Sequence, residues 1–175
     1  MSQLQELRQQ IDDFMGHHPQ SPLAREQQNA FEGLEYYDED ADFAFVVTVE
    51  RFPDSEPLIV METSTGDKRP YRRWGRFSIT VDGEMGQLTI FSDPDEDDFF
   101  LPFRDATSGK ETYGAGRYMD SQRPGLRQIA DNQIEIDFNF VYNPYCAYNE
   151  RFSCPLPPVE NWLKISIRAG EKKFR

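Results

Sequence analysis

Two segments of the chain, residues 104–118 and 137–149, concentrate side chains that can bind or activate a small molecule. The first segment is rich in glycine, which lets backbone approach a ligand closely, and its Arg117 could bind a carboxylate or phosphate through two parallel hydrogen bonds. In the second segment, Asp137 and Asn139 have the alternating spacing that brings side chains to one face of a strand. We therefore predict a polar pocket for a small anionic metabolite, built from both segments.

The residue types suggest a role for each candidate. Asp137 or Glu160 could act as a general base if the protein is an enzyme, and Tyr113 or Tyr142 could then donate a proton. The candidate ligand-binding residues share a charged or hydrogen-bonding side chain and are Arg104, Thr107, Thr112, Arg117, Asn139, Tyr142, Asn143 and Tyr148. The same residue types also tie irregular loops to the backbone, so a structural role is the alternative. The pattern leaves open whether the chain is an enzyme and which cofactor, if any, it uses.

The cysteines and histidines offer no familiar catalytic arrangement. Cys146 and Cys154 lie eight positions apart in a proline-rich stretch, where they could form a disulfide, hold a metal ion or remain buried thiols. A reducing compartment disfavours the disulfide and a zinc site lacks a close second pair of ligands, so we interpret them as buried structural thiols. His17 and His18 lie between two expected helices, and no Gly-x-Ser-x-Gly nucleophile motif occurs. We assign no residue to a metal site.

Composition excludes several classes of protein. The 175 residues carry a formal net charge of -12, which would repel nucleic acids and anionic membranes. Hydrophobic residues make up 38 %, enough for a folded core, yet no apolar run is long enough to span a membrane. The first residues lack the basic and apolar regions of a signal peptide, so we expect a cytoplasmic protein. The acidic surface fits adaptation to high salt as well as it fits an ordinary acidic protein.

Two helices are expected near the N-terminus. Apolar residues recur there at the three- and four-residue steps of an amphipathic helix, at Leu4, Leu7, Ile11 and Phe14. Ser2 and Gln5 fit a capping box at the start of this helix, and Gly16 fits a left-handed cap at its end. A second, short helix is predicted from Ser21, as its N-cap, toward Phe31.

Beyond residue 34 the hydrophobic period changes to two, which is typical of strands with one buried face. Such segments occur at residues 43–49, 77–81, 88–90, 99–103, 134–140 and 163–167. The acidic run at 93–98 is predicted to be a hairpin loop, because Asp98 stands where a calcium loop needs glycine. We predict a mainly β fold, a single antiparallel β-barrel or sandwich with one or two short N-terminal helices. Residues 1–34 would form a helical segment packed on the barrel, and residues 35–175 the antiparallel β domain.

The sequence around both polar segments resembles one known family. The matching motifs are LPFRDATSGKETYGAGRY at 101–118, DFN at 137–139, YNPYCAYN at 142–149, CPLPP at 154–158 and AGEK at 169–172. They resemble an uncharacterised prokaryotic family known as domain of unknown function 1684, over nearly the whole chain. The family has no established activity, so the resemblance implies only that the two polar segments belong to one shared feature.

Two other classes of function fit the same residues. A non-catalytic protein-interaction or structural module would use the proline-rich segment 155–158 and the helices, and it would have no deep polar pocket. A metal-dependent enzyme would combine Asp137 and Glu160 with Cys146 or Cys154, although mixed oxygen and thiolate ligands with so little histidine disfavour it. A small-molecule ligand is therefore the expected partner, and neither nucleic acid nor membrane is expected.

Overall fold

The computed structural model describes residues 1–174 as two helices followed by a strand-rich body. The helices are α1 (Gln3–His17) and α2 (Arg25–Asn29). The strands are β1 (Ala44–Thr48), β2 (Glu50–Arg51), β3 (Ile59–Glu62), β4 (Lys68–Val81), β5 (Glu84–Ser92), β6 (Phe99–Phe103), β7 (Arg117–Asp120), β8 (Leu126–Ala130) and β9 (Gln133–Asp137). Short 3₁₀ turns are η1 (Ala41–Phe43), η2 (Phe138–Phe140), η3 (Tyr145–Ala147) and η4 (Val159–Asn161).

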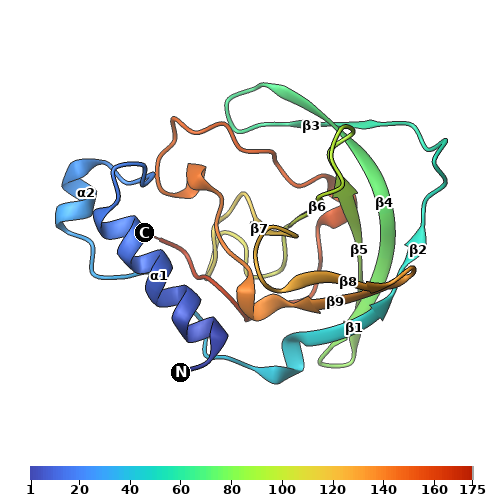
Figure 1. Cartoon of the computed structure of the whole chain (residues 1–175), viewed down its shortest axis with the longest axis horizontal. Helices are drawn as coiled ribbons and strands as arrows, with labels where there is room; N and C mark the ends of the chain where they lie inside the picture. Colours follow the sequence, from blue (N-terminus) through green and yellow to red (C-terminus); the bar gives the residue numbers. More distant parts are fainter. Residues whose placement is uncertain (175) are drawn as a thin grey trace.

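The strands form two antiparallel sheets, as Figure 1 shows. One sheet has the order β1-β9-β8, and the other has the order β2-β4-β5-β6-β7 with β3 added to β4. The chain passes between the sheets at buried Val49, whose N–H donates to the Asn132 backbone oxygen at 2.7 Å. The opposite edges of the two sheets are β7 and β8, and these strands do not pair within the described chain. The sheets therefore do not close into a ring, so the barrel alternative is wrong and the fold is sandwich-like.

The predicted alternation of apolar residues builds the core. The segments expected at 43–49, 77–81, 88–90 and 99–103 all contain or lie within strands, and the acidic run at 93–98 connects paired strands β5 and β6. Their inward side chains pack with those of β9 in one cluster, which includes fully buried Leu88, Ile90, Leu101, Phe103, Ile134 and Ile136. This confirms the mainly β, antiparallel fold.

Two expected strands differ from the prediction for the same physical reason. Strand β9 ends at Asp137, whose carboxylate accepts the N–H of Asn139 at 2.9 Å and turns the chain into η2. Residues 163–167 form no strand, because side chains replace part of the backbone ladder. The N–H of Ile167, for example, donates to a carboxylate oxygen of Asp105 at 2.6 Å. Asn139 therefore lies beyond the strand row on which we expected it.

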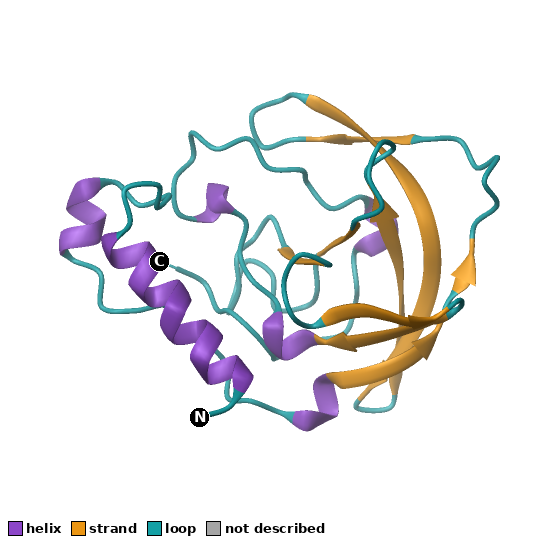
Figure 2. Ribbon diagram, in the orientation of Figure 1, coloured by secondary structure: helices purple, strands orange, loops and turns teal. Residues whose placement is uncertain are grey.

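The N-terminal helices also differ from the prediction in their ends. The capping box of Ser2 and Gln5 is present, but α1 continues to His17 and ends without a left-handed cap at Gly16. Helix α2 begins at Arg25 with Ala24 as its N-cap, and the predicted cap Ser21 instead lies in the preceding turn, where its hydroxyl donates to the Met15 backbone oxygen at 2.7 Å and accepts the Leu23 N–H at 3.2 Å. Figure 2 shows the strands gathered in one half of the molecule, with α1, α2 and long loops in the other.

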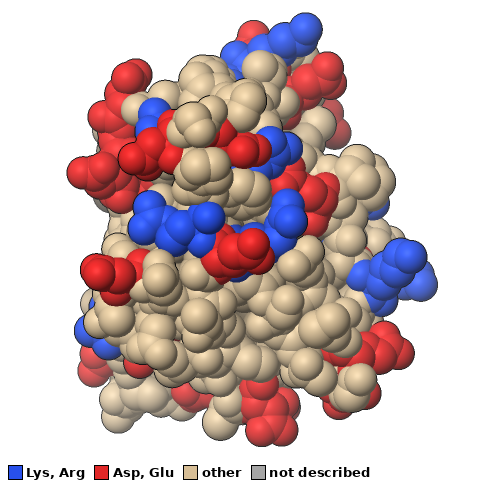
Figure 3. Space-filling model, turned by 90° about the vertical axis from the view of Figure 1, so that its right-hand side faces the viewer, with Lys and Arg blue, Asp and Glu red and all other residues tan. Residues whose placement is uncertain are grey.

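The surface carries charges of both signs. On the face shown in Figure 3, acidic and basic side chains alternate along one band, and no continuous basic area is visible. Among the helices of residues 1–174, none is long and apolar enough to cross a membrane.

We predict that two glycines with nearly the same positive φ angle tolerate alanine very differently. Gly170 (φ +78°) is so enclosed that a Cβ would lie 2.6 Å from the Val141 backbone oxygen, whereas Gly83 (φ +79°) has nothing within 4 Å. Gly83→Ala should lower the free energy of unfolding by about 1–2 kcal/mol through backbone strain alone. Gly170→Ala should add a steric cost of about 1–3 kcal/mol. Urea unfolding followed by circular dichroism measures both, and equal losses would contradict this account.

Candidate functional site

Arg117, the predicted anion-binding residue, is a fully buried cation at the start of β7. Its guanidinium donates hydrogen bonds of 2.6 to 3.1 Å to the backbone oxygens of Ile167, Ala169 and Glu171. A carboxylate oxygen of Asp105 lies 3.6 Å away and supplies the counter-charge. Burial lowers the pKa of Arg117, and the nearby Asp105 charge opposes this effect. The donors of Arg117 are therefore directed at the C-terminal segment of the chain.

The loop after β6 is organised around the carboxylate of Asp105. It accepts hydrogen bonds from the hydroxyls of Thr107 at 2.8 Å and Ser108 at 3.2 Å, and from the N–H of Ile167. The hydroxyls of Thr107 and Thr112 are 2.9 Å apart, and both residues are buried. These two predicted ligand-binding residues therefore already have partners within the loop.

The C-terminal segment held by Arg117 places a buried acid, Glu171, in the interior. Its carboxylate accepts the N–H of Asn143 at 2.9 Å, the side-chain amide of Asn143 at 3.1 Å and the hydroxyl of Tyr148. Burial raises the pKa of Glu171 to about 7, although the Tyr148 and Asn143 hydrogen bonds favour the charged form. The structure thus brings together two predicted residues, Asn143 and Tyr148, around an acid that can change its charge near neutral pH.

A cleft of about 310 Å³ lies between α1 and this acid, and we call it the α1 cleft. Helix α1 contributes an apolar wall, while the opposite wall is mostly polar and aromatic. The lining residues are Leu7, Gln10, Ile11, Phe14, Met15, Arg123, Tyr142, Asn143, Tyr145, Tyr148 and Glu171. A concave site with an apolar wall and a few convergent polar groups is the usual form of a small-molecule pocket.

Arg123 and Asn143 have unused hydrogen-bonding groups at this cleft. The Arg123 guanidinium carbon lies 3.7 Å from the centre of the Tyr142 ring, and within residues 1–174 the side chain has neither an ion pair nor a hydrogen bond. Asn143 is 2 % exposed, and its Oδ1 atom has no partner in the described chain. Tyr142 donates its hydroxyl to Asp120, and burial raises its pKa.

A second cavity of about 550 Å³ adjoins the α1 cleft, and we call it the Cys154 groove. The two share the residues Arg123, Tyr142, Asn143 and Tyr145. The groove also contains Arg69, Tyr118, Ser153 and Cys154 in its wall. The two cavities are therefore neighbours that share part of one wall.

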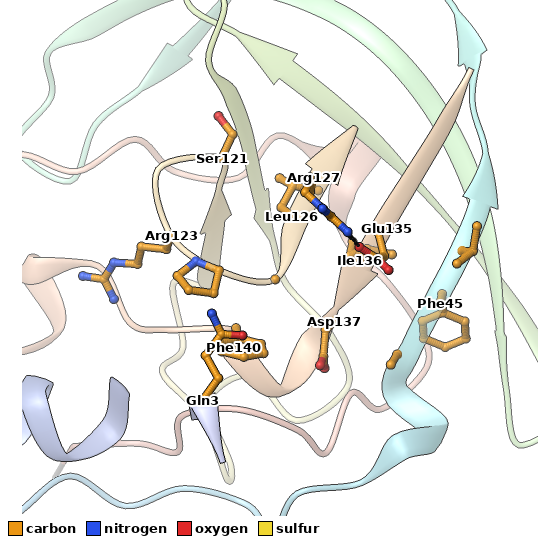
Figure 4. A pocket seen from close by; sticks show the side chains of 14 residues that line it. Gln3, Phe45, Ser121, Arg123, Leu126, Arg127, Glu135, Ile136, Asp137 and Phe140 are labelled. Carbon is orange, nitrogen blue, oxygen red and sulfur yellow. Dashed lines mark hydrogen bonds and ion pairs between the residues drawn. The ribbon is translucent and has the colours of Figure 1, made fainter. Parts of the chain in front are cut away.

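Asp137 lines a different pocket of about 660 Å³ between β1, β8 and β9, shown in Figure 4. One carboxylate oxygen of Asp137 accepts both the N–H and the side-chain amide of Asn139, at 2.9 and 2.8 Å. The Asn139 amide in turn bonds the backbone of Asp40. Figure 4 shows Arg123 at the edge of this pocket, with its guanidinium pointing away from Asp137. Asp137 and Asn139 thus lie together, but outside the α1 cleft.

The remaining predicted residues occupy other parts of the fold. Arg104 stacks on Trp162, with its guanidinium carbon 4.5 Å from the ring centre. The carboxylate of Glu160 pairs with Arg73 at 2.8 Å and accepts the Thr89 hydroxyl at 2.9 Å. Tyr113 lies beside Cys146, which we consider below. Across residues 1–174, no group of three or more His, Cys, Asp or Glu side chains is placed to hold a metal ion.

The sequence reasoning missed Arg123 and Glu171. Arg123 follows β7 in a short turn and has no local pattern that separates it from other surface arginines. Glu171 occurs in the AGEK motif, which gave the only signal, through the family resemblance. Neither residue is close in sequence to Asn143, so only the folded chain shows that they share a cleft.

We predict that Arg117→Met strongly destabilises the protein. The change leaves Asp105 buried without a counter-charge and leaves three backbone oxygens without their donor. Removing one partner of a buried ion pair costs about 3–5 kcal/mol. The matched control is Arg127→Met, which breaks the exposed pair with Glu135 and should cost less than about 1 kcal/mol. Similar losses for the two variants in urea unfolding would contradict a structural role for Arg117.

We predict that Glu171 makes the protein less stable as pH rises through neutrality. Its pKa is higher in the folded chain, at about 7, than the ordinary value of 4.5, so the folded state holds the proton more tightly. This contribution is fully present below about pH 4.5 and is lost as pH rises to about 7, for a total of about 3 kcal/mol.

The measurement is the free energy of unfolding of wild type and Glu171→Gln at pH 5 and pH 8. Subtracting the free energy of unfolding of Glu171→Gln from that of wild type removes the contribution of all other titrating groups. We expect this difference to be smaller at pH 8 than at pH 5, because wild type loses stability that Glu171→Gln keeps. A difference that is independent of pH would show that the acid does not titrate in this range.

Comparisons with known proteins agree with this structure. The family model for proteins of unknown function DUF1684 matches residues 29–172. A similar solved structure is the solution NMR structure of the uncharacterized protein from gene locus rrnAC0354 of Haloarcula marismortui. It is 39 % identical, has a TM-score of 0.71, and the match covers 97 % of this chain and 92 % of that chain. No curated protein matches. The chain therefore belongs to the DUF1684 family of proteins of unknown function.

Proposed function

We propose that this protein binds a small organic anion in the α1 cleft, with Arg123 as the residue that holds the charge. The observation that carries the proposal is the pair of unused groups described above, a guanidinium and a buried amide oxygen, in the wall of one cavity. The class of ligand is the anionic metabolite expected from the sequence, but the cation differs from the predicted Arg117.

Arg123 is suited to anion binding because its position is already set. Its guanidinium stacks over Tyr142, and an Arg that stacks on an aromatic ring loses less freedom when it binds. Its planar group can form two parallel hydrogen bonds with a carboxylate or phosphate. Tyr142 is itself held by its hydrogen bond to Asp120, so the platform under the cation is fixed.

Asn143 defines a second property of the ligand. Its amide nitrogen donates to Glu171 and to the Lys172 backbone oxygen, at 3.1 and 3.0 Å, which orients Oδ1 as a free acceptor. Oδ1 is itself buried, so a ligand reaches it only where the cleft wall moves aside, and a hydrogen bond donated there removes a cost of about 1–3 kcal/mol. We therefore expect the anion to carry a hydroxyl or amino group.

The remaining wall favours a ligand with an apolar body. Phe14 and Met15 of α1 pack with Tyr145 and Tyr148 in one apolar cluster at the cleft, and the cleft volume fits a compact molecule. Glu171, with its pKa near 7, could accept or donate a proton at the bound molecule. Catalysis by Asp137, Tyr113 and Glu160 stays a prediction.

Phenyllactate is a suitable probe because it combines a carboxylate, a hydroxyl donor and an aromatic ring. We expect binding to be measurable by NMR titration, with shifts confined to the cleft. Arg123→Gln should weaken binding about 10- to 100-fold, the value of a charge-assisted hydrogen bond. Arg127→Gln is the matched control, since Arg127 is exposed on β8 and should have no effect.

Two related compounds test the separate contacts. 3-Phenylpropanoate lacks the hydroxyl and should bind about 10-fold more weakly, while phenyllactamide lacks the charge and should be insensitive to Arg123→Gln. The proposal is wrong if none of the compounds binds, or if Arg123→Gln binds phenyllactate as wild type does.

A further inference from the structure

The two thiols, Cys146 and Cys154, are held against each other by separate parts of the fold. Both are free and buried, and the N–H of Cys146 donates to the sulfur of Cys154 at 3.3 Å. Cys154 is fixed by Ser64, which bonds its N–H at 3.1 Å and its backbone oxygen at 2.9 Å. Cys146 lies in the turn η3. The contact between the thiols is therefore imposed by the scaffold.

The surroundings of the two sulfurs differ. The Tyr113 hydroxyl donates to the Cys146 sulfur at 3.5 Å, whereas the Cys154 sulfur accepts a backbone N–H. The adjacent Cys154 thiol and, after it, the Tyr113 hydroxyl lower the pKa of Cys146 to about 6, against the effect of burial. The same hydrogen bond from Cys154 to Cys146 raises the pKa of Cys154. The hydrogen bond from Tyr113 therefore favours the thiolate form of Cys146.

A small molecule can approach the pair from the side of Cys154. Cys154 lines the Cys154 groove together with Ser153 and Tyr118, and the groove is large enough for an oxidant of a few atoms. Cys146 is 5 % exposed and Cys154 is 8 % exposed. Reactive cysteines combine thiolate character with a nearby resolving thiol, and both features are present here.

We propose that Cys146 and Cys154 form a redox-active dithiol that reduces a hydroperoxide, with Cys146 as the attacking residue and Cys154 as the resolving one. The Cys146 thiolate attacks one oxygen of hydrogen peroxide; the O–O bond breaks, hydroxide leaves and takes up a proton, and Cys146 becomes a sulfenic acid. The Cys154 sulfur then attacks the Cys146 sulfur, the S–O bond breaks and water leaves with the Cys154 proton. The two thiols are oxidised to one disulfide, and the peroxide is reduced to two waters.

This inference does not depend on the α1 cleft or on any ligand bound there.

The first test is treatment of the folded wild-type protein with one equivalent of hydrogen peroxide, followed by denaturation, alkylation and mass spectrometry. We expect both alkylatable thiols to be lost, a mass decrease of two hydrogen atoms, and a disulfide within one chain. Retention of two thiols, or a disulfide only between chains, would overturn the proposal.

Single variants test the assigned order of the steps. Cys154→Ser should stop at the sulfenic acid, which dimedone traps on Cys146, whereas Cys146→Ser should react at least about 10-fold more slowly. The assignment is wrong if the dimedone adduct does not form on Cys146 in Cys154→Ser.

Tyr113→Phe tests the environment of the thiolate without removing a sulfur. Loss of the hydroxyl should raise the pKa of Cys146 and slow its reaction at pH 7 by about threefold or more. The matched control is Tyr37→Phe, a partly buried tyrosine whose hydroxyl bonds Glu111 instead, and its rate should equal that of wild type. Equal rates for both variants would contradict the role given to Tyr113.

Discussion

The buried charge pair of Arg117 and Asp105 holds the C-terminal segment in place and, through it, one wall of the α1 cleft. Residues 163–174 form no strand, so their buried backbone groups need other partners in the interior. Arg117 supplies donors for three of their oxygens, and Asp105 accepts the N–H of Ile167. The backbone of the C-terminal segment is thus hydrogen-bonded by side chains, whereas in a sheet it would be bonded by the backbone of a neighbouring strand. The pair also neutralises two charges that would be costly to bury alone.

This arrangement has a direct effect on the candidate site. The segment bound by Arg117 carries Glu171, and the Glu171 carboxylate in turn fixes Asn143 and Tyr148. Burying the charged form of Glu171 is unfavourable, and this raises the pKa of its carboxyl group to about 7. The polar wall of the α1 cleft is held by these hydrogen bonds, while the facing wall is a single amphipathic helix. Such a cavity can recognise a ligand through a few fixed groups.

The two proposed sites are neighbours. The turn η3 carries Cys146 between Tyr145 and Tyr148, which line the α1 cleft, and Cys154 lines the adjoining groove. A disulfide between the cysteines would join η3 to the segment beside Ser64, so oxidation at one site would act on the wall of the other. The family has no established function, and these two sites give it specific chemistry to examine.

The antiparallel β character, the capped helix α1 and the core residues of several strands were predictable from local patterns, because these features depend on residues only a few positions apart. Alternation places Leu88 and Ile90 inside whatever the topology, and Ser2 caps a helix through a residue three positions away. The tertiary structure alone decided that the sheets stay open and that Arg117 is a scaffold residue. It also assembled the α1 cleft from Arg123, Asn143 and Glu171, since contacts between distant residues depend on topology and burial, which no local pattern contains.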